Sequence, residues 1–190
     1  MTEPIMESLA SEDDGNETVW ESPTPADKTA EPLPSGPYRS SSRHGTFVTM
    51  FELCDVQAKL DSIREDNAEA TIESEANTLG GYTVCVQCKL QKNKEGEISV
   101  TFMVCLRCGE WDAHMDWPFT KKLTVVLSHV DGQDKDITLL VPMSSETDVV
   151  KKPAPGGCNK GHESEPLSWE EIQRRGLVYK DTLYVNIELE

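Results

Sequence analysis

The sequence predicts an all-β protein: an antiparallel β-sandwich with one short connecting helix, preceded by a disordered N-terminal arm. After residue 44, apolar and polar residues alternate with a period of two in several short segments separated by polar turns. Residues 1–44 instead hold nine acidic and three basic residues and six of the 11 prolines. Such an arm buries too little apolar surface to offset its chain entropy. We therefore expect an arm over residues 1–44 and a sandwich domain over residues 45–190.

The strands of the sandwich are expected where this alternation occurs. In chain order, the segments are Phe47–Leu53, Tyr82–Leu90, Ile98–Leu106, Leu123–Val130, Ile137–Val141 and Leu183–Leu189. The second and third should form a hairpin closed by the polar residues 93–96, and the fourth and fifth a hairpin that turns at residues 131–132. The last segment alternates most regularly, and the first is the weakest.

One helix is predicted between Leu167 and Gly176. Ser168 is its expected N-cap, with Glu171 as the capping-box partner, and Gly176 suits the left-handed position after the last turn. Apolar residues at 56, 60 and 63 also have helical spacing, but the polar residues between them fit a short helix and an irregular loop equally well.

The charge of the chain argues against several classes of partner. The 190 residues include 18 basic and 34 acidic ones, a formal net charge of −16. Phosphate backbones and anionic lipid heads would repel such a chain, so we expect no binding to nucleic acid. We also expect no membrane insertion, because no apolar run approaches the roughly 18 residues of a membrane span. The first residues lack a signal peptide, which favours a cytoplasmic protein.

Two CxxC pairs form the sharpest chemical pattern. Cys85 and Cys88 are followed by Cys105 and Cys108, a separation that matches the ligand spacing of a structural four-cysteine zinc ribbon. If both pairs lie on continuous strands, however, Cys85 and Cys105 face one side of the sheet while Cys88 and Cys108 face the other. Four thiolates divided in this way cannot share an ion. A small zinc-ribbon protein therefore remains the alternative to a sandwich without metal.

Catalytic motifs are not found. Cys158 and His162 could act as a thiolate and its base, but they belong to a Pro- and Gly-rich loop without a recognisable orienting partner. No nucleotide-binding or serine-hydrolase motif occurs. We therefore expect a protein that is not an enzyme and uses no cofactor.

A resemblance to a known family rests on several stretches in the expected order. The most specific is Arg107–Phe119, which contains Trp-Pro-Phe and runs directly into the strand at Leu123. A Gly-Tyr-x-x-Cys strand at residues 81–85, a Lys-Pro pair with Gly-Cys at residues 157–158, and the end at residues 179–185 follow the same pattern. Residues 45–190 thus resemble the C-terminal TRAF domain, or MATH (meprin and TRAF homology) domain. This resemblance implies about eight strands, with Trp111 and Trp117 in core positions.

The resemblance also implies a function. MATH domains bind extended peptides of receptor tails or signalling partners, and the matching site would combine the strand Tyr82–Leu90, treated as an edge, with the facing loop of residues 141–158. Several side chains there differ from those of receptor adaptors, so a different peptide is expected. The implied peptide-binding positions are Gln87, Lys89, Asn93, Phe119, Thr147, Asp148 and Gly156.

No RING, zinc-finger, coiled-coil or metalloprotease pattern accompanies this domain. The sequence therefore predicts a non-enzymatic adaptor module whose partners are proteins, namely receptor cytoplasmic tails or signalling proteins. We expect the isolated chain to be a monomer that becomes trimeric only if a partner supplies a coiled coil.

Overall fold

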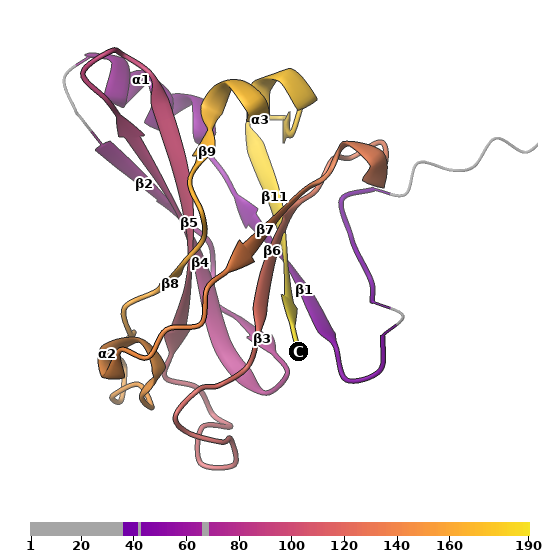
Figure 1. Ribbon diagram of the computed structural model, residues 1–190, viewed down its shortest axis with the longest axis vertical. Helices are drawn as coiled ribbons and strands as arrows, with labels where there is room; N and C mark the ends of the chain where they lie inside the picture. Colours follow the sequence, from indigo (N-terminus) through magenta and orange to yellow (C-terminus); the bar gives the residue numbers. More distant parts are fainter. Residues whose placement is uncertain (1–35, 42, 66–68) are drawn as a thin grey trace, which may run out of the picture. The chain divides into compact units, whose positions relative to one another are not determined.

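The computed structural model describes residues 36–41, 43–65 and 69–190. Most of the arm expected over residues 1–44 lies outside this part of the chain. Within it, the chain forms two antiparallel sheets with short helices at their ends (Figure 1). The predicted fold class, an antiparallel β-sandwich, is confirmed.

Sheet A has four strands in a continuous order and a short fifth strand that pairs with one of the inner strands. The order is β1 (Phe47–Leu53), β11 (Thr182–Leu189), β6 (Leu123–Leu127) and β7 (Ile137–Val141), and β10 (Val178–Tyr179) pairs with β11.

Sheet B contains the long hairpin. Its order is β2 (Glu69–Glu73), β4 (Tyr82–Lys92), β5 (Ile98–Arg107) and β8 (His162–Glu163), while β3 (Asn77–Leu79) pairs with β4 and β9 (Leu167–Ser168) with β5. Of the 11 described strands, β3, β8, β9 and β10 have only two or three residues, too short for an alternating pattern to reveal, and the five-residue β2 was not predicted either.

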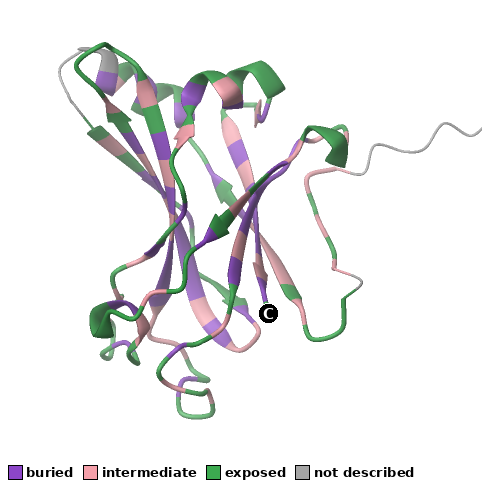
Figure 2. Ribbon diagram, in the orientation of Figure 1, coloured by how far each residue is buried: buried purple, intermediate pink, exposed green. Residues whose placement is uncertain are grey.

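The core lies between the two sheets. Alternate residues of β4, such as Val84, Val86 and Leu90, are fully buried and belong to the same apolar cluster as Val185 and Ile187 of β11. Figure 2 shows this buried band running along the middle strands, with exposed residues at the loops and helices. The period-two pattern therefore identified the inward face of both sheets correctly.

The helices cover the ends of the sandwich. They are α1 (Val56–Glu65), α2 (Thr147–Val150) and α3 (Trp169–Arg175), with a 3-10 turn, η1, at Gln133–Lys135. The segment that suited a helix or a loop equally well thus forms α1, whose apolar positions are buried in the core.

The predicted caps of α3 are only partly correct. Ser168 is the N-cap and Gly176 adopts the left-handed conformation with φ of 68°, as expected. The predicted capping box is wrong, because the Ser168 hydroxyl accepts a hydrogen bond from the backbone N–H of Glu170 at 3.2 Å. Glu171 instead forms an ion pair with Arg175, whose Nε lies 2.6 Å from its carboxylate.

The strand expected over Leu123–Val130 ends at Leu127. Hydrogen bonding to β11 continues for one more residue, since the N–H of Ser128 donates to the carbonyl of Tyr184 at 2.9 Å, but the N–H of His129 donates to the Asp136 carboxylate at 2.8 Å instead. The chain leaves the sheet at this point, and the connection to β7 is longer than the predicted two-residue turn because it includes η1.

The described end of the arm binds to the outer face of sheet A. Asn186 of β11 donates to the carbonyl of Pro37 at 2.8 Å and accepts from the backbone N–H of Arg39 at 3.2 Å. The Arg39 guanidinium makes two hydrogen bonds to the Asp136 carboxylate, at 2.6 and 2.7 Å, and one to the carbonyl of His129 at 2.9 Å. Contacts of the sandwich therefore begin before the expected boundary at residue 45.

Candidate functional site

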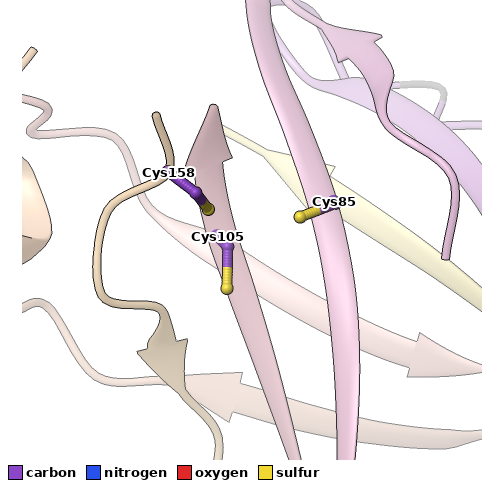
Figure 3. Close-up of side chains that lie close together, drawn as sticks. All are labelled: Cys85, Cys105 and Cys158. Atoms are coloured by element: carbon purple, nitrogen blue, oxygen red, sulfur yellow. The ribbon is translucent and has the colours of Figure 1, made fainter. Parts of the chain in front are cut away.

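Three cysteine thiols gather on the outer face of sheet B. Cys85 of β4 and Cys105 of β5 face each other directly in the strand register. Their sulfur atoms and that of Cys158 all lie within 4.8 Å of one another. In Figure 3, Cys85 extends from β4 toward the other two residues. We call these three residues the thiol cluster.

Backbone hydrogen bonds place Cys158 beside β5. The N–H of Cys108 donates to the carbonyl of Gly157 at 3.0 Å, and the N–H of Asn159 donates to the carbonyl of Leu106 at 2.9 Å. Gly161 lets the segment pass close over the sheet, because a Cβ atom there would lie 2.9 Å from the sulfur of Cys105. The position of Cys158 is thus fixed by the sheet edge, although the residue itself is exposed.

Interactions within the thiol cluster change the pKa values of its members. A hydrogen bond with the thiol of Cys105 lowers the pKa of Cys85. The same interaction, together with burial, raises the pKa of Cys105. Burial and the charge of Cys85 raise the pKa of Cys158. The three thiols therefore influence one another's ionisation and do not titrate as independent groups.

The two CxxC pairs do not converge. Cys88 belongs to the apolar core on the inner face of β4, and burial raises its pKa to about 12. Cys108 lies half-buried just beyond the end of β5. As the strand geometry predicted, Cys85 and Cys105 share the opposite face from Cys88. The four-cysteine zinc ribbon of Cys85, Cys88, Cys105 and Cys108 does not fit this arrangement.

Cys158 and His162 do not form a catalytic pair. Cys158 is opposite Arg107 on the outer face of sheet B, whereas His162 is opposite the core residue Val104. The imidazole is buried at a ring-centroid distance of 5.3 Å from Phe119, and burial lowers its pKa. The thiol and the imidazole therefore point to opposite sides of the sheet.

Two of the predicted peptide-binding residues lie on the same outer face as the thiol cluster. Gln87 and Lys89 alternate with the inward residues of β4 and are half-buried. The ammonium group of Lys89 is 3.5 Å from the carboxylate of Glu69 on β2, and Gln87 is opposite Met103 of β5.

Three further predicted residues lie near the thiol cluster. Thr147 and Asp148 are exposed on α2, and Gly156 is exposed in the loop before Cys158. The carbonyl of Asp148 accepts a hydrogen bond from the N–H of Lys160 at 3.2 Å, which ties α2 to the edge of sheet B. The side chain of Lys151 lies 2.7 Å from the Asp148 carboxylate and lowers its pKa.

Asn93 is separated from the other predicted residues. It lies in the turn between β4 and β5, six residues beyond Gln87 or roughly 20 Å along an extended strand. Its side-chain carbonyl accepts hydrogen bonds from the N–H groups of Glu95 and Glu97 at 3.0 and 2.9 Å. Asn93 also lines a cavity of about 520 Å³, together with Trp169 of α3.

The aromatic stretch differs from the expectation in two respects. Phe119 is 1% exposed and packs against Tyr82 with ring centroids 5.0 Å apart, so it offers no surface to a peptide. Trp111, expected in the core, is 58% exposed. Trp117 does pack against the Tyr82 ring at 5.4 Å, and its indole N–H donates to the carbonyl of Asp112 at 3.0 Å.

The strand that the sequence treats as an edge of sheet B lies inside the sheet. β4 pairs with β2 and β3 on one side and with β5 on the other, so the expected binding edge at Tyr82–Leu90 is wrong. Among the described strands of sheet B, β8 pairs with β5 alone, just as β2 and β3 pair only with β4 and β9 only with β5. β8 is therefore an edge at which an added strand can pair.

The hydrogen-bond register shows which backbone groups this edge exposes. Glu163 is opposite Met103, and the adjacent N–H of Ser164 donates to the carbonyl of Phe102 at 2.8 Å. In an antiparallel ladder, this makes Glu163 and Met103 a non-hydrogen-bonded pair. The N–H and C=O of Glu163 therefore point away from β5. The two bonds that flank the pair of Cys158 with Arg107 give Cys158 the same orientation.

Comparison with protein families matches residues 73–186 to the TRAF/meprin MATH domain. The chain belongs to this family. Its domain is similar in structure to TRAF5 of Notothenia coriiceps, with a TM-score of 0.55 and 16% sequence identity over 75% of this chain and 72% of that one. A comparison with curated protein sequences found no match. MATH domains are protein-interaction modules, so this chain carries a protein-interaction domain.

Two features of this MATH domain were missed by the reasoning from sequence. Cys158 lies far along the chain from Cys85 and Cys105, so no local spacing indicates the thiol cluster. The sequence did predict that Cys85 and Cys105 share one face of the sheet, and a cysteine from a loop can join them there. Arg39 was assigned to the arm by composition, although a lone arginine before a sandwich can form an ion pair with it.

Proposed function

We propose that this MATH domain binds an extended segment of a partner protein at the β8 edge, as a non-enzymatic adaptor. The observation that supports this most is the outward direction of the backbone N–H and C=O groups of Glu163 and Cys158. Strand addition uses backbone groups of this kind for affinity, and neighbouring side chains for specificity. The proposal transfers the peptide site from β4 to β8.

The side chains near this edge support an interaction with a polar or charged segment. Thr147, Asp148 and Gly156 flank the edge from α2 and its following loop. Gln87 and Lys89 lie two strands away, about 10 Å, and are reached only by long side chains that cross the outer face of β5. The ion pair of Lys89 with Glu69 is partly exposed, so an acidic residue of the ligand competes with it at low cost.

The proposal leads to a specific pair of variants. Glu163→Pro removes the outward N–H, and Glu163→Ala removes the side chain but keeps that N–H. The intrasheet bond next to it, from Ser164 to Phe102, is retained in both. Peptides selected from a random library on the wild-type chain should bind the proline variant about fivefold more weakly. This factor corresponds to the loss of one hydrogen bond of about 1 kcal/mol.

The alanine variant is the control for loss of the side chain. Affinity within about twofold of wild type is expected for it, since the backbone donor is unchanged. Equal binding by the proline variant and wild type, with both folded by circular dichroism, would contradict pairing at β8. Loss of binding with Lys89→Glu alone would place the ligand on the outer face of β4 instead.

Partners, location and assembly follow from the same proposal. The ligand is a segment of a receptor cytoplasmic tail or a signalling protein, which implies a cytoplasmic site of action. No described helix has the length and apolarity to cross a membrane. The isolated chain is proposed to be a monomer, and sedimentation at two salt concentrations tests this directly.

A further inference from the structure

The thiol cluster has the composition of a metal site. Three sulfur atoms within 4.8 Å of one another come from β4, from β5 and from the segment that runs beside β5. We propose that Cys85, Cys105 and Cys158 bind a zinc ion. This inference goes beyond peptide binding and does not depend on it.

The spacing of the sulfur atoms is close to that of a zinc–thiolate site. Zinc binds thiolates tetrahedrally at about 2.3 Å, which separates two sulfur ligands by about 3.8 Å. The upper limit of 4.8 Å among the three atoms exceeds this value by about 1 Å. Rotations of the three side chains supply that adjustment without any movement of the strands.

The backbone holds all three ligands in place before an ion binds. Cys85 and Cys105 are directly opposite each other in the most extensive strand pair of sheet B. Cys158 is held between the two bonds from Cys108 to Gly157 and from Asn159 to Leu106. A site on sheet backbone of this kind needs little ordering when the metal enters.

Glu73 of β2 is the candidate for the fourth ligand. Its Oε1 atom lies 3.7 Å from the sulfur of Cys85, and the side chain is 48% exposed and therefore free to turn. Three thiolates, the Glu73 carboxylate and one zinc ion carry a net charge of −2, and the guanidinium of Arg107, 3.6 Å from Glu73, offsets one unit of this charge. An oxygen donor beside three thiolates suits zinc, whereas Cu(I) prefers sulfur alone.

The test uses the reduced full chain and zinc chloride as the only ligand. Equilibrium dialysis with elemental analysis should give one zinc ion per chain, and Co²⁺ in its place should produce the near-ultraviolet sulfur-to-metal absorption of a thiolate site. Cys158→Ser should weaken zinc binding at least about a hundredfold, since it removes one of three protein thiolates. Gly161→Ala, which moves the segment off Cys105, should weaken it as well.

Two cysteines of the same chain provide matched controls. Cys54 is exposed, as Cys158 is, and Cys108 belongs to the predicted zinc-ribbon set, but neither is part of the thiol cluster. Their serine variants should bind zinc as wild type does. The proposal is wrong if wild type binds less than about half an equivalent, if Cys158→Ser binds as tightly as wild type, or if Cys108→Ser loses as much affinity as Cys158→Ser.

Discussion

Removal of the Arg39 side chain should destabilise the whole sandwich. Arg39 and Asp136 have side chains only 6% and 10% exposed, and two hydrogen bonds of 2.6 and 2.7 Å join them. In Arg39→Ala, the Asp136 carboxylate keeps one described donor, the N–H of His129 at 2.8 Å. Breaking a buried ion pair in this way costs about 3–5 kcal/mol. In the variant, the arm can detach from sheet A and let water reach Asp136, so we expect the free energy of unfolding to fall by about 2–3 kcal/mol.

Urea unfolding of the full chain measures this loss. Arg43→Ala is the matched control, because it removes the same side chain from the same segment, but at a site that is 60% exposed and paired with Glu188. Its cost should stay below about 1 kcal/mol. The difference between the two variants measures how much more the buried contacts of Arg39 contribute than the exposed ion pairs of Arg43 with Glu188 and Glu190. An Arg39→Ala loss below about 0.5 kcal/mol, or one equal to that of Arg43→Ala, would refute the reasoning.

Two further predictions concern stability. Burial lowers the pKa of His162 from its ordinary value of 6.5. The stability that the buried neutral imidazole contributes is therefore fully present above pH 6.5 and is lost as the pH falls toward the pKa of His162 in the folded state. Urea midpoints should therefore fall more between about pH 7.5 and about pH 5.5 in wild type than in His162→Leu, and equal falls would contradict this. Ser168→Ala should cost about 1 kcal/mol through loss of the N-cap, whereas Glu171→Ala should cost no more than about 0.5 kcal/mol; similar losses would favour the capping box.

Alternation along the chain was sufficient to find the longest strands, although it missed the five-residue β2. It identified both strands of the β4–β5 hairpin and the last strand, because each has one face buried in the core and one face outside. It could not find strands of two residues, such as β8, whose pairing is decided by contacts with β5. The ends of strands were also not predicted correctly. β6 ends earlier than expected, where the N–H of His129 donates to the Asp136 carboxylate.

The candidate site was harder to predict because it depends on which strands become neighbours. The alternating pattern of β4 places Gln87 and Lys89 correctly on the outer face, but it does not reveal that β4 has partners on both sides. Phe119 and Trp111 illustrate the same limit: both are aromatic residues of one stretch, and only the local path of the loop decides that the first is buried and the second exposed.

Amide exchange at the β8 edge tests the proposed binding mode most directly. With a library-selected peptide bound, the N–H groups of Glu163 and Cys158 should exchange more slowly, because they gain acceptors from the added strand. The N–H of Ser164 is the internal reference, since it already donates to Phe102 at 2.8 Å and should change little. Protection confined to other strands, with Glu163 and Cys158 exchanging as in the free protein, would contradict strand addition at β8.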